Sequence, residues 1–259
     1  MGGKFIGLAS SASRFIRMKP SLSTLGNPLL DFIYPRICCT CGKEITDGDE
    51  NGLCWDCRTE SLALIPPWCE RCGQVVAGRV DHAFTCADCE EHPPLYQRGR
   101  SLYRYEGGVR TAIHALKYHH DFSVVPDLSL LLLAGLRTHF ENASDLVLVP
   151  VPLHPKRLRK RGFNQGRELI RGMKKLDSSL KVWTGIKRIK DTETQTRLSK
   201  AARRENVRSA FAVNKREKAP ARVLLIDDVM TTGATLHECS KVLKRAGVQE
   251  IHTLTVARG

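Results

Sequence analysis

The 259-residue chain lacks three features that would assign it to common classes of protein. Its longest apolar run, Leu128 to Leu136, is far shorter than the roughly 20 residues that a membrane-spanning helix needs. Its first 30 residues lack the continuous apolar core of a secretory signal. No G-x-x-x-x-G-K-[ST] sequence occurs, which excludes a Walker-type phosphate loop. We therefore expect a soluble, cytoplasmic protein without a membrane span.

Acidic residues are scarce in two segments. The first 30 residues contain none and are basic and rich in serine. This composition resembles a transit peptide, but a disordered tail or an early start codon explains it as well, so we expect a flexible tail over residues 1–34. Residues 156–222 hold 22 Lys and Arg against six Asp and Glu, an excess of 16 that accounts for the net charge of +14. Such a segment favours a phosphorylated small molecule or a nucleic acid, and a solvated basic surface is the plainer alternative.

Cysteine is almost absent outside one short region. Nine of the ten cysteines lie between residues 38 and 89, and eight of these form four C-x-x-C pairs. The pairs are Cys38/Cys41, Cys54/Cys57, Cys69/Cys72 and Cys86/Cys89. Four thiolates at this spacing suit a tetrahedral zinc ion, and a closed Cys₄ site is structural. We expect about two structural Zn²⁺ ions in a module over residues 35–92.

Three points about the cysteines stay open at this stage. Pairs that follow one another in the chain can share an ion, which gives two zinc ribbons, or the pairs can interleave. Redox pairs of the thioredoxin kind are an alternative, but the strand and helix around such a motif are missing. Cys39 is an extra thiol without an assigned role.

From Tyr96 onward, short apolar strands alternate with segments of helical periodicity. The predicted strands are residues 101–105, 146–151, 223–226 and 251–257, and the predicted helices are 109–118, 126–140, 165–176 and 234–246. This alternation predicts an α/β fold, with a parallel sheet covered by helices on both faces. Ligands of such sheets bind beyond the carboxyl ends of the strands.

The stretch VLLIDDVMTTGAT, residues 223–235, carries the chemistry expected at such an end. Thr231, Thr232, Gly233, Ala234 and Thr235 lead into a helix, whose first amides and neighbouring hydroxyls make an anion site. Asp227 and Asp228 stand just before it, where they can hold two sugar hydroxyls or the water on a bound Mg²⁺. The segment can therefore bind both ends of a sugar phosphate, the phosphate at residues 231–235 and the hydroxyls at the two aspartates.

The same stretch closely resembles the phosphoribosyl pyrophosphate (PRPP) loop of type I phosphoribosyltransferases. YPRICCTCG, the cysteine pairs, VPVPLHPKRLRKRGFNQGRELI and TQTRLSKAARRENVRSAF occur with it in an order that resembles the ComF family, the amidophosphoribosyltransferase-like competence proteins. The resemblance covers residues 30–257. It implies a phosphoribosyltransferase domain over residues 96–259, preceded by a double zinc ribbon.

The family resemblance implies roles for matching residues. Asp227 and Asp228 would bind ribose hydroxyls, residues 231–235 would hold the 5-phosphate, and residues 149–152 with the basic loop after them would face pyrophosphate. The candidates in that loop are Arg157, Lys160 and Arg161, because arginine and lysine stabilise a leaving pyrophosphate. A surface helix or a nucleic-acid patch is the alternative for them.

Other positions carry weaker expectations. Some relatives have a third acid where this chain has Thr231, which is a poor general base. Residues 194–211 are expected to form a cover over the site, with Gln195, Arg203 and Asn206 matching the family pattern. We expect His114 to be structural, and we assign no chemistry to Lys117 although it matches the family pattern.

Three functions follow as expectations. The first is an Mg²⁺-dependent phosphoribosyltransferase that releases pyrophosphate from PRPP. The second is a PRPP-sensing protein that binds single-stranded DNA without catalysis, since the family is associated with DNA uptake. The third is a zinc-stabilised module that binds proteins of the competence machinery. The acceptor substrate is not identified by the sequence.

Overall fold

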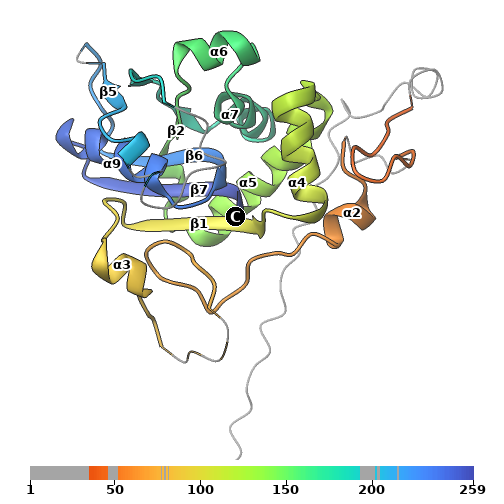
Figure 1. Cartoon of the computed structure of the whole chain (residues 1–259), viewed down its shortest axis with the longest axis horizontal. Coiled ribbons are helices and arrows are strands. Elements are labelled where there is room, and N and C mark those ends of the chain that lie inside the picture. The colour runs from red at the N-terminus through yellow and green to blue at the C-terminus, as the bar shows by residue number, and fades with distance from the viewer. Residues whose placement is uncertain are drawn as a thin grey trace, which may run out of the picture.

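A five-stranded parallel sheet forms the centre of the computed structural model, with strand order β1-β7-β6-β2-β3 (Figure 1). The structure describes residues 35–45, 52–76, 78, 80, 82–192, 202, 205–214 and 216–259, so the predicted tail and most of the predicted cover lie outside it. The strands are β1 (Arg98–Arg104), β2 (Val147–Pro150), β3 (Lys181–Val182), β6 (Arg222–Met230) and β7 (Glu250–Arg258). The parallel sheet predicted from the sequence is confirmed.

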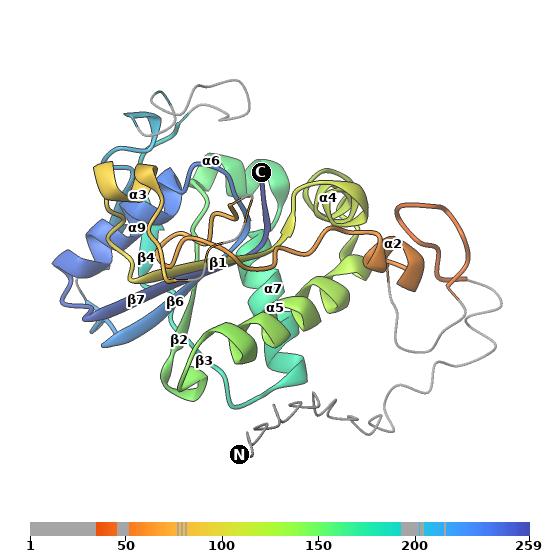
Figure 2. The same ribbon diagram turned by 90° about the horizontal axis from the view of Figure 1, so that it is seen from below.

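Helices cover both faces of this sheet (Figure 2). The helices α4 (Gly107–His114), α5 (Val125–His139) and α7 (Gln165–Leu176) lie on one face, and α9 (Ala234–Arg245) lies on the other. Side chains of β6 alternate between the faces, so Leu224 packs beneath α5 and α7 whereas Leu225 packs beneath α9. Each such fully buried leucine stabilises the fold by roughly 1.5–3 kcal/mol.

The helix ends follow from local sequence. Asn164 caps α7 by accepting a hydrogen bond from the backbone N–H of Arg167 at 2.9 Å. Pro126 lies in the first turn of α5, where its missing N–H costs nothing. Past the end of α9, Gly247 has a φ of +90°, a backbone region that glycine enters easily.

The strand β3 was not predicted from the sequence, and β1 begins three residues earlier than expected. Two further elements end at places that differ from the prediction. The strand expected over residues 223–226 continues to Met230, because Asp227 pairs with Thr255 of β7 and so belongs to the ladder. Aspartate is depleted in strands, which is why the sequence indicated an earlier end. The helix expected over residues 109–118 ends as α4 at His114, and a π-helical turn, η2 (Ala115–His119), follows it. His114 is exposed, with its ring 4.5 Å from that of Tyr118.

The remaining elements are short. They are α2 (Trp55–Thr59), α3 (Ala87–Glu91), η3 (Phe122–Val124), η4 (Ala143–Asp145), α6 (Pro155–Arg161) and the antiparallel pair β4 (Ile186–Arg188) and β5 (Phe211–Val213). The segment predicted as a basic loop therefore contains a helix, α6. In the described part of the chain, no helix has the length and apolar character needed to cross a membrane.

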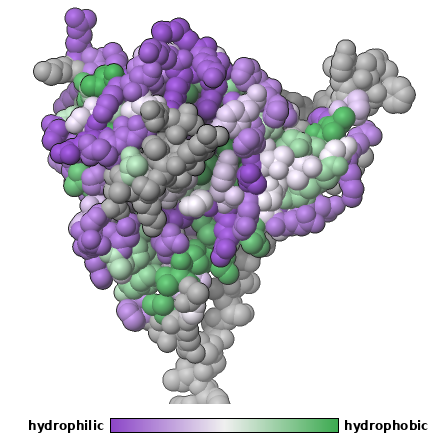
Figure 3. All heavy atoms as spheres, in the orientation of Figure 1, coloured by the Kyte–Doolittle hydropathy of each residue, from purple (hydrophilic) through white to green (hydrophobic). Residues whose placement is uncertain are grey.

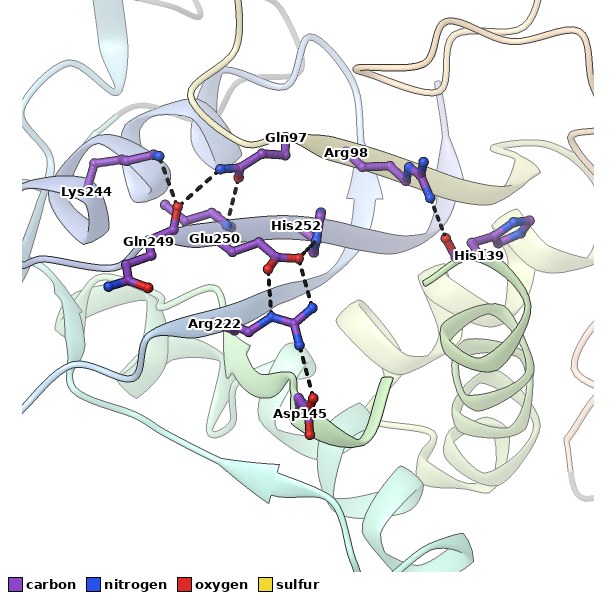
Figure 4. A network of polar contacts seen from close by, with 10 residues as sticks. Gln97, Arg98, His139, Asp145, Arg222, Lys244, Gln249, Glu250 and His252 are labelled. Atoms are coloured by element: carbon purple, nitrogen blue, oxygen red, sulfur yellow. Dashed lines mark hydrogen bonds and ion pairs between the residues drawn. The ribbon is translucent and has the colours of Figure 1, made fainter. Parts of the chain in front are cut away.

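An ionic network ties the amino ends of the strands together, opposite the end where the aspartates lie (Figure 4). Arg222 of β6 binds both carboxylate oxygens of Glu250 of β7, at 2.6 and 3.1 Å, and also contacts Asp145 at 3.2 Å. The Arg222 guanidinium, together with the ring of His252, lowers the pKa of Glu250 to about 2. The Glu250 carboxylate therefore stays ionised and paired throughout the neutral range.

The cysteine-rich segment packs against the sheet domain through many hydrogen bonds, some of which come from two buried charged side chains. Asp127 at the start of α5 is 2 % exposed and accepts hydrogen bonds from the backbone amides of Gly52 and Leu53, at 2.8 and 3.2 Å. Arg100 of β1 is also buried and binds the backbone carbonyl and carboxylate of Glu70, at 3.1 and 3.0 Å. The boundary between residues 35–92 and 96–259 stays a prediction.

Candidate ligand cleft and metal centres

The eight paired cysteines form two separate clusters. The first contains Cys38, Cys41, Cys54 and Cys57, and the second contains Cys69, Cys72, Cys86 and Cys89. Within each cluster all sulfur atoms lie within 4.8 Å of one another. Pairs that follow one another in the chain therefore share a site, and the interleaved alternative is excluded. Cys39 belongs to neither cluster.

The geometry of both clusters fits zinc. The Sγ atoms of Cys41 and Cys54 are 3.7 Å apart, and those of Cys72 and Cys86 are 3.8 Å apart. A tetrahedron with Zn–S bonds of about 2.3 Å has an edge of about 3.8 Å. Backbone amides also point at sulfur, as in the 3.4 Å contact from Cys54 N to Cys38 Sγ. Each cluster would hold one structural Zn²⁺ ion and leave no coordination position free.

A cleft of about 390 Å³ opens at the carboxyl ends of β2 and β6. It exists because β6 pairs with β2 only as far as Ile226 but with β7 as far as Met230. Its walls come from the end of β6, the loop before α9, the segment after β2 and the helices α6 and α7. Figure 3 shows hydrophilic side chains over α6, at the top of the molecule.

The two aspartates take opposite sides of β6. Asp228 is 2 % exposed; the ammonium of Lys117 contacts its Oδ2, and the side-chain amide of Gln165 donates to its Oδ1 at 3.2 Å. Asp227 is partly exposed and lines the cleft, and its Oδ1 accepts the backbone N–H of Asp228 at 2.9 Å. Both oxygens of Asp228 are therefore engaged within the protein, whereas Asp227 is the carboxylate presented to a ligand.

The charges of this pair differ for a physical reason. Burial raises the pKa of both carboxyl groups because it disfavours the ionised form. At Asp228 the Lys117 ammonium outweighs burial and lowers the pKa, and the same contact raises the pKa of Lys117. At Asp227 burial and the neighbouring Asp228 charge act together, and the pKa is raised well above its usual value. A ligand that donates hydrogen bonds to Asp227, or a cation bound beside it, would stabilise the ionised form of this carboxyl group.

The threonine–glycine loop lies beside the aspartates, as the sequence predicted. Residues 231–235 all line the cleft, and α9 begins at Ala234 directly after Gly233. Gly233 has a φ of +73°, a left-handed conformation that residues other than glycine rarely adopt, and this φ favours glycine at the position. The loop thus turns sharply and presents the N-terminal amides of a twelve-residue helix to the cleft.

Three arginines line the same cleft, and two of them, Arg157 and Arg188, donate hydrogen bonds to the backbone carbonyl and the hydroxyl of Thr192. Arg157 and Arg161, four residues apart on α6, share the side of that helix that lines the cleft, and Arg188 of β4 joins them. Arg161 donates to the amide oxygen of Gln165 at 2.8 Å, which links it to the residue that binds Asp228. Lys160 is exposed on α6 and does not line the cleft.

Lys117, Gln165 and Arg188 were not assigned to the site from the sequence. Lys117 is separated from Asp228 by 111 positions in the sequence, and only the π-helical turn after α4 brings its ammonium to the carboxylate. The only feature of the sequence that could have pointed to Lys117 was its match to the family pattern. Gln195 and Arg203 of the predicted cover lie outside the described residues.

Comparisons with known proteins match both parts of the chain. A family model described as a double zinc ribbon domain matches residues 29–90, and one described as a phosphoribosyl transferase domain matches residues 158–259. Competence protein F of Haemophilus influenzae is 33% identical over 215 residues, which cover 81% of this chain and 91% of that protein. The DNA utilization protein YhgH of Salmonella typhimurium is 30% identical over 234 residues, covering 80% and 97%.

Two further similarities are more distant. Competence protein ComFC of Streptococcus pneumoniae is 25% identical over 215 residues, covering 81% of this chain and 89% of that protein. Among solved structures, a hypoxanthine phosphoribosyltransferase from Staphylococcus aureus is 18% identical with a TM-score of 0.32, covering 51% of this chain and 61% of that one. The phosphoribosyltransferase fold is thus established by the family model.

Proposed function

The chain belongs to the ComF family of competence proteins, and from this membership we propose that its cleft binds PRPP through Asp227 and the loop at residues 231–235. The observation that supports this proposal is that one cleft is lined by an aspartate, the N-terminus of α9 and three arginines. Ribose hydroxyls would donate to Asp227, the 5-phosphate would lie on the α9 amides, and the pyrophosphate would face Arg157, Arg161 and Arg188. Lys160 is left out of the proposed site.

Mg²⁺ fits this cleft as a companion of the ligand. Mg²⁺ in phosphate sites is usually held by one or two carboxylates together with substrate phosphates and water. Asp227 offers one carboxylate, while Asp228 is engaged by Lys117 and Gln165. Asp227 would therefore hold the ion, which would neutralise charge on the pyrophosphate.

Transfer of the phosphoribosyl group would depend on positioning and charge. The arginines would stabilise the negative charge that develops as pyrophosphate leaves, and Asp227 would fix the sugar. Thr231 is a poor base, so the acceptor is expected to be a nitrogen nucleophile that needs no proton removed beforehand. Pyrophosphate release from PRPP, screened with amines and nucleobases, tests this step.

Replacement of Asp227 tests the binding site directly. Asp227→Asn is expected to weaken PRPP binding in the presence of Mg²⁺ by at least about 10-fold, because hydrogen bonds to a charged group contribute about 1.5–3 kcal/mol. Isothermal titration calorimetry measures the effect. Asp56→Asn, on the exposed side of α2, is the matched control. Absence of PRPP binding to the wild-type protein, or equal binding by Asp227→Asn, would rule out the assignment.

A second candidate function, binding of single-stranded DNA, is favoured by a basic groove on α7. A groove of about 470 Å³ beside β3 has a mostly apolar surface and is bordered by Arg167, Arg171, Lys174 and Lys175, all four of them exposed. Arg171 is paired with Glu168. Exposed cations that border a groove suit a phosphate backbone. This groove lies apart from the PRPP cleft, so one protein can have both functions. Partner proteins of the competence machinery stay a prediction.

Salt dependence tests the DNA proposal. With a fluorescent oligo(dT) probe, affinity is expected to fall steeply with salt, by a log–log slope of about 0.7 for each phosphate neutralised. Lys174→Gln with Lys175→Gln should reduce that slope by about 1.4. Asp227→Asn should leave it unchanged. A response that is flat with salt, or the same in the double variant, counts against α7 as the interface.

A further inference from the structure

A second cavity, of about 460 Å³, lies behind the loop that precedes α9. One wall comes from α3 and the segment at His92–Pro94, and the other comes from α9, which lies next to α3 in Figures 1 and 2. Residues 230 and 232–234 line both this cavity and the PRPP cleft. Neither aspartate is among the described residues that line the second cavity. One loop therefore separates two cavities.

The charge of the second cavity differs from that of the first. Four carboxylates and three Lys or Arg side chains line it, and two of the cations are paired in the wall itself, Arg208 with Glu205 and Lys241 with Glu238, each at 3.5 Å. The PRPP cleft instead has four Lys or Arg side chains against two carboxylates. A polyphosphate is therefore suited to the first cavity and disfavoured in the second.

The Tyr96 hydroxyl is available to a molecule in this cavity. Tyr96 is 3 % exposed and lines the cavity, and no hydrogen bond joins its hydroxyl to any described residue. The hydroxyl lies 3.5 Å from the point where a Cβ on Gly233 would stand, so it reaches the base of the shared loop. A tyrosine hydroxyl can donate one hydrogen bond and accept another, so this group can fix the orientation of a bound molecule. Pro93, Pro94 and Met230 supply apolar surface around it.

We propose that this cavity is a second binding site, which takes an uncharged planar heterocycle with ring donors and acceptors, such as a nucleobase. The Tyr96 hydroxyl can give or accept one hydrogen bond, and the apolar residues can cover the faces of a ring. The volume lies within the range of about 300–1,000 Å³ typical of small-molecule sites.

Occupancy of the two cavities is coupled through the loop that they share. A ligand against Tyr96 contacts Gly233 and Ala234 from behind, while the 5-phosphate of PRPP would contact them from the front. Each ligand therefore changes the affinity of the other by the same factor. This coupling rests on the proposed PRPP site, whereas the existence of the second site does not.

Calorimetric titration of the full chain with adenine, hypoxanthine, cytosine and uracil, each alone and then with PRPP and Mg²⁺, tests the proposal. At least one base is expected to bind the wild-type protein. Tyr96→Phe should weaken it by about 2–10-fold, the effect of one hydrogen bond. His237→Trp, which fills the cavity, should abolish it. Tyr105→Phe in the PRPP cleft is the matched control and should leave base binding unchanged.

The outcomes separate the two proposals. If PRPP binds and no base does, the second site is overturned and the PRPP site stands. If a base binds in a Tyr96-dependent manner and PRPP does not, the second site stands, and the PRPP site and the coupling are overturned. Base binding that is lost in Asp227→Asn but kept in both Tyr96→Phe and His237→Trp places the base in the first cleft and overturns the proposal. An unchanged PRPP affinity at saturating base overturns the coupling.

Discussion

Lys117→Met is expected to lower the free energy of unfolding by about 3–5 kcal/mol, because it leaves the buried carboxylate of Asp228 without its counter-charge. Asp228 is 2 % exposed, and the Lys117 ammonium is the cation in contact with it. Methionine keeps much of the length and apolar bulk of the lysine side chain, so the lost charge dominates. Urea denaturation at pH 7, with matched slopes for both proteins, measures the difference.

The double variant Lys117→Met, Asp228→Asn provides the control. Removal of both charges leaves no unpaired ion, so a large part of the lost stability should return, and the coupling energy of the pair follows from the double-mutant cycle. If Lys117→Met unfolds within about 0.5 kcal/mol of the wild type, a span typical of surface substitutions, Lys117 does not have this role.

The two zinc sites are expected to differ in their importance to the sheet domain. Cys69, Cys72 and Cys89 of the second cluster belong to the same hydrophobic core as Leu236 and Leu243 of α9. The first cluster has a small core of its own. Structural zinc in small ribbons contributes about 10–16 kcal/mol of apparent binding free energy. Loss of the second ion should therefore also destabilise the sheet domain.

Metal analysis and unfolding of three serine variants check this expectation. Wild-type protein should contain two zinc ions per chain, and Cys57→Ser and Cys89→Ser should each lose one. Cys89→Ser should lower the midpoint of thermal unfolding of the sheet domain more than Cys57→Ser does. Cys39→Ser, outside both clusters, is the control and should keep both ions. A wild-type content of one ion, or an ion lost in Cys39→Ser, would contradict the assignment of ligands.

Local sequence patterns were sufficient for four of the five strands of the sheet, the main helices and the threonine–glycine loop. Apolar periodicity placed α7 at its observed bounds, Gln165–Leu176, and the C-x-x-C spacing identified all eight clustered cysteines. These features depend on neighbours a few residues away, which is the information that a single sequence contains. The spacing alone could not decide which pairs share a site.

Contacts between distant segments escaped prediction. Asp227 and Asp228 were expected to act as equals, and both line the cleft. Asp227 is partly exposed there, whereas Asp228 is buried against Lys117 and Gln165. The assignment depends on how far β6 continues and on the π-helical turn after α4, and neither feature has a reliable local signal. Lys160 was grouped with Arg157 and Arg161 because the helical face of α6 was not anticipated.

Because β6 is longer than β2, one side of the cleft is fixed by strand pairing, whereas the other side can vary in sequence and length. Past Ile226, β7 is the only strand among the described residues that pairs with β6, so strand hydrogen bonds to β7 fix the position of Asp227. The opposite side, residues 152–154 and α6, has no strand partner among the described residues. Insertions or substitutions there can reshape the end of the cleft that would receive pyrophosphate while the proposed sugar site keeps its geometry.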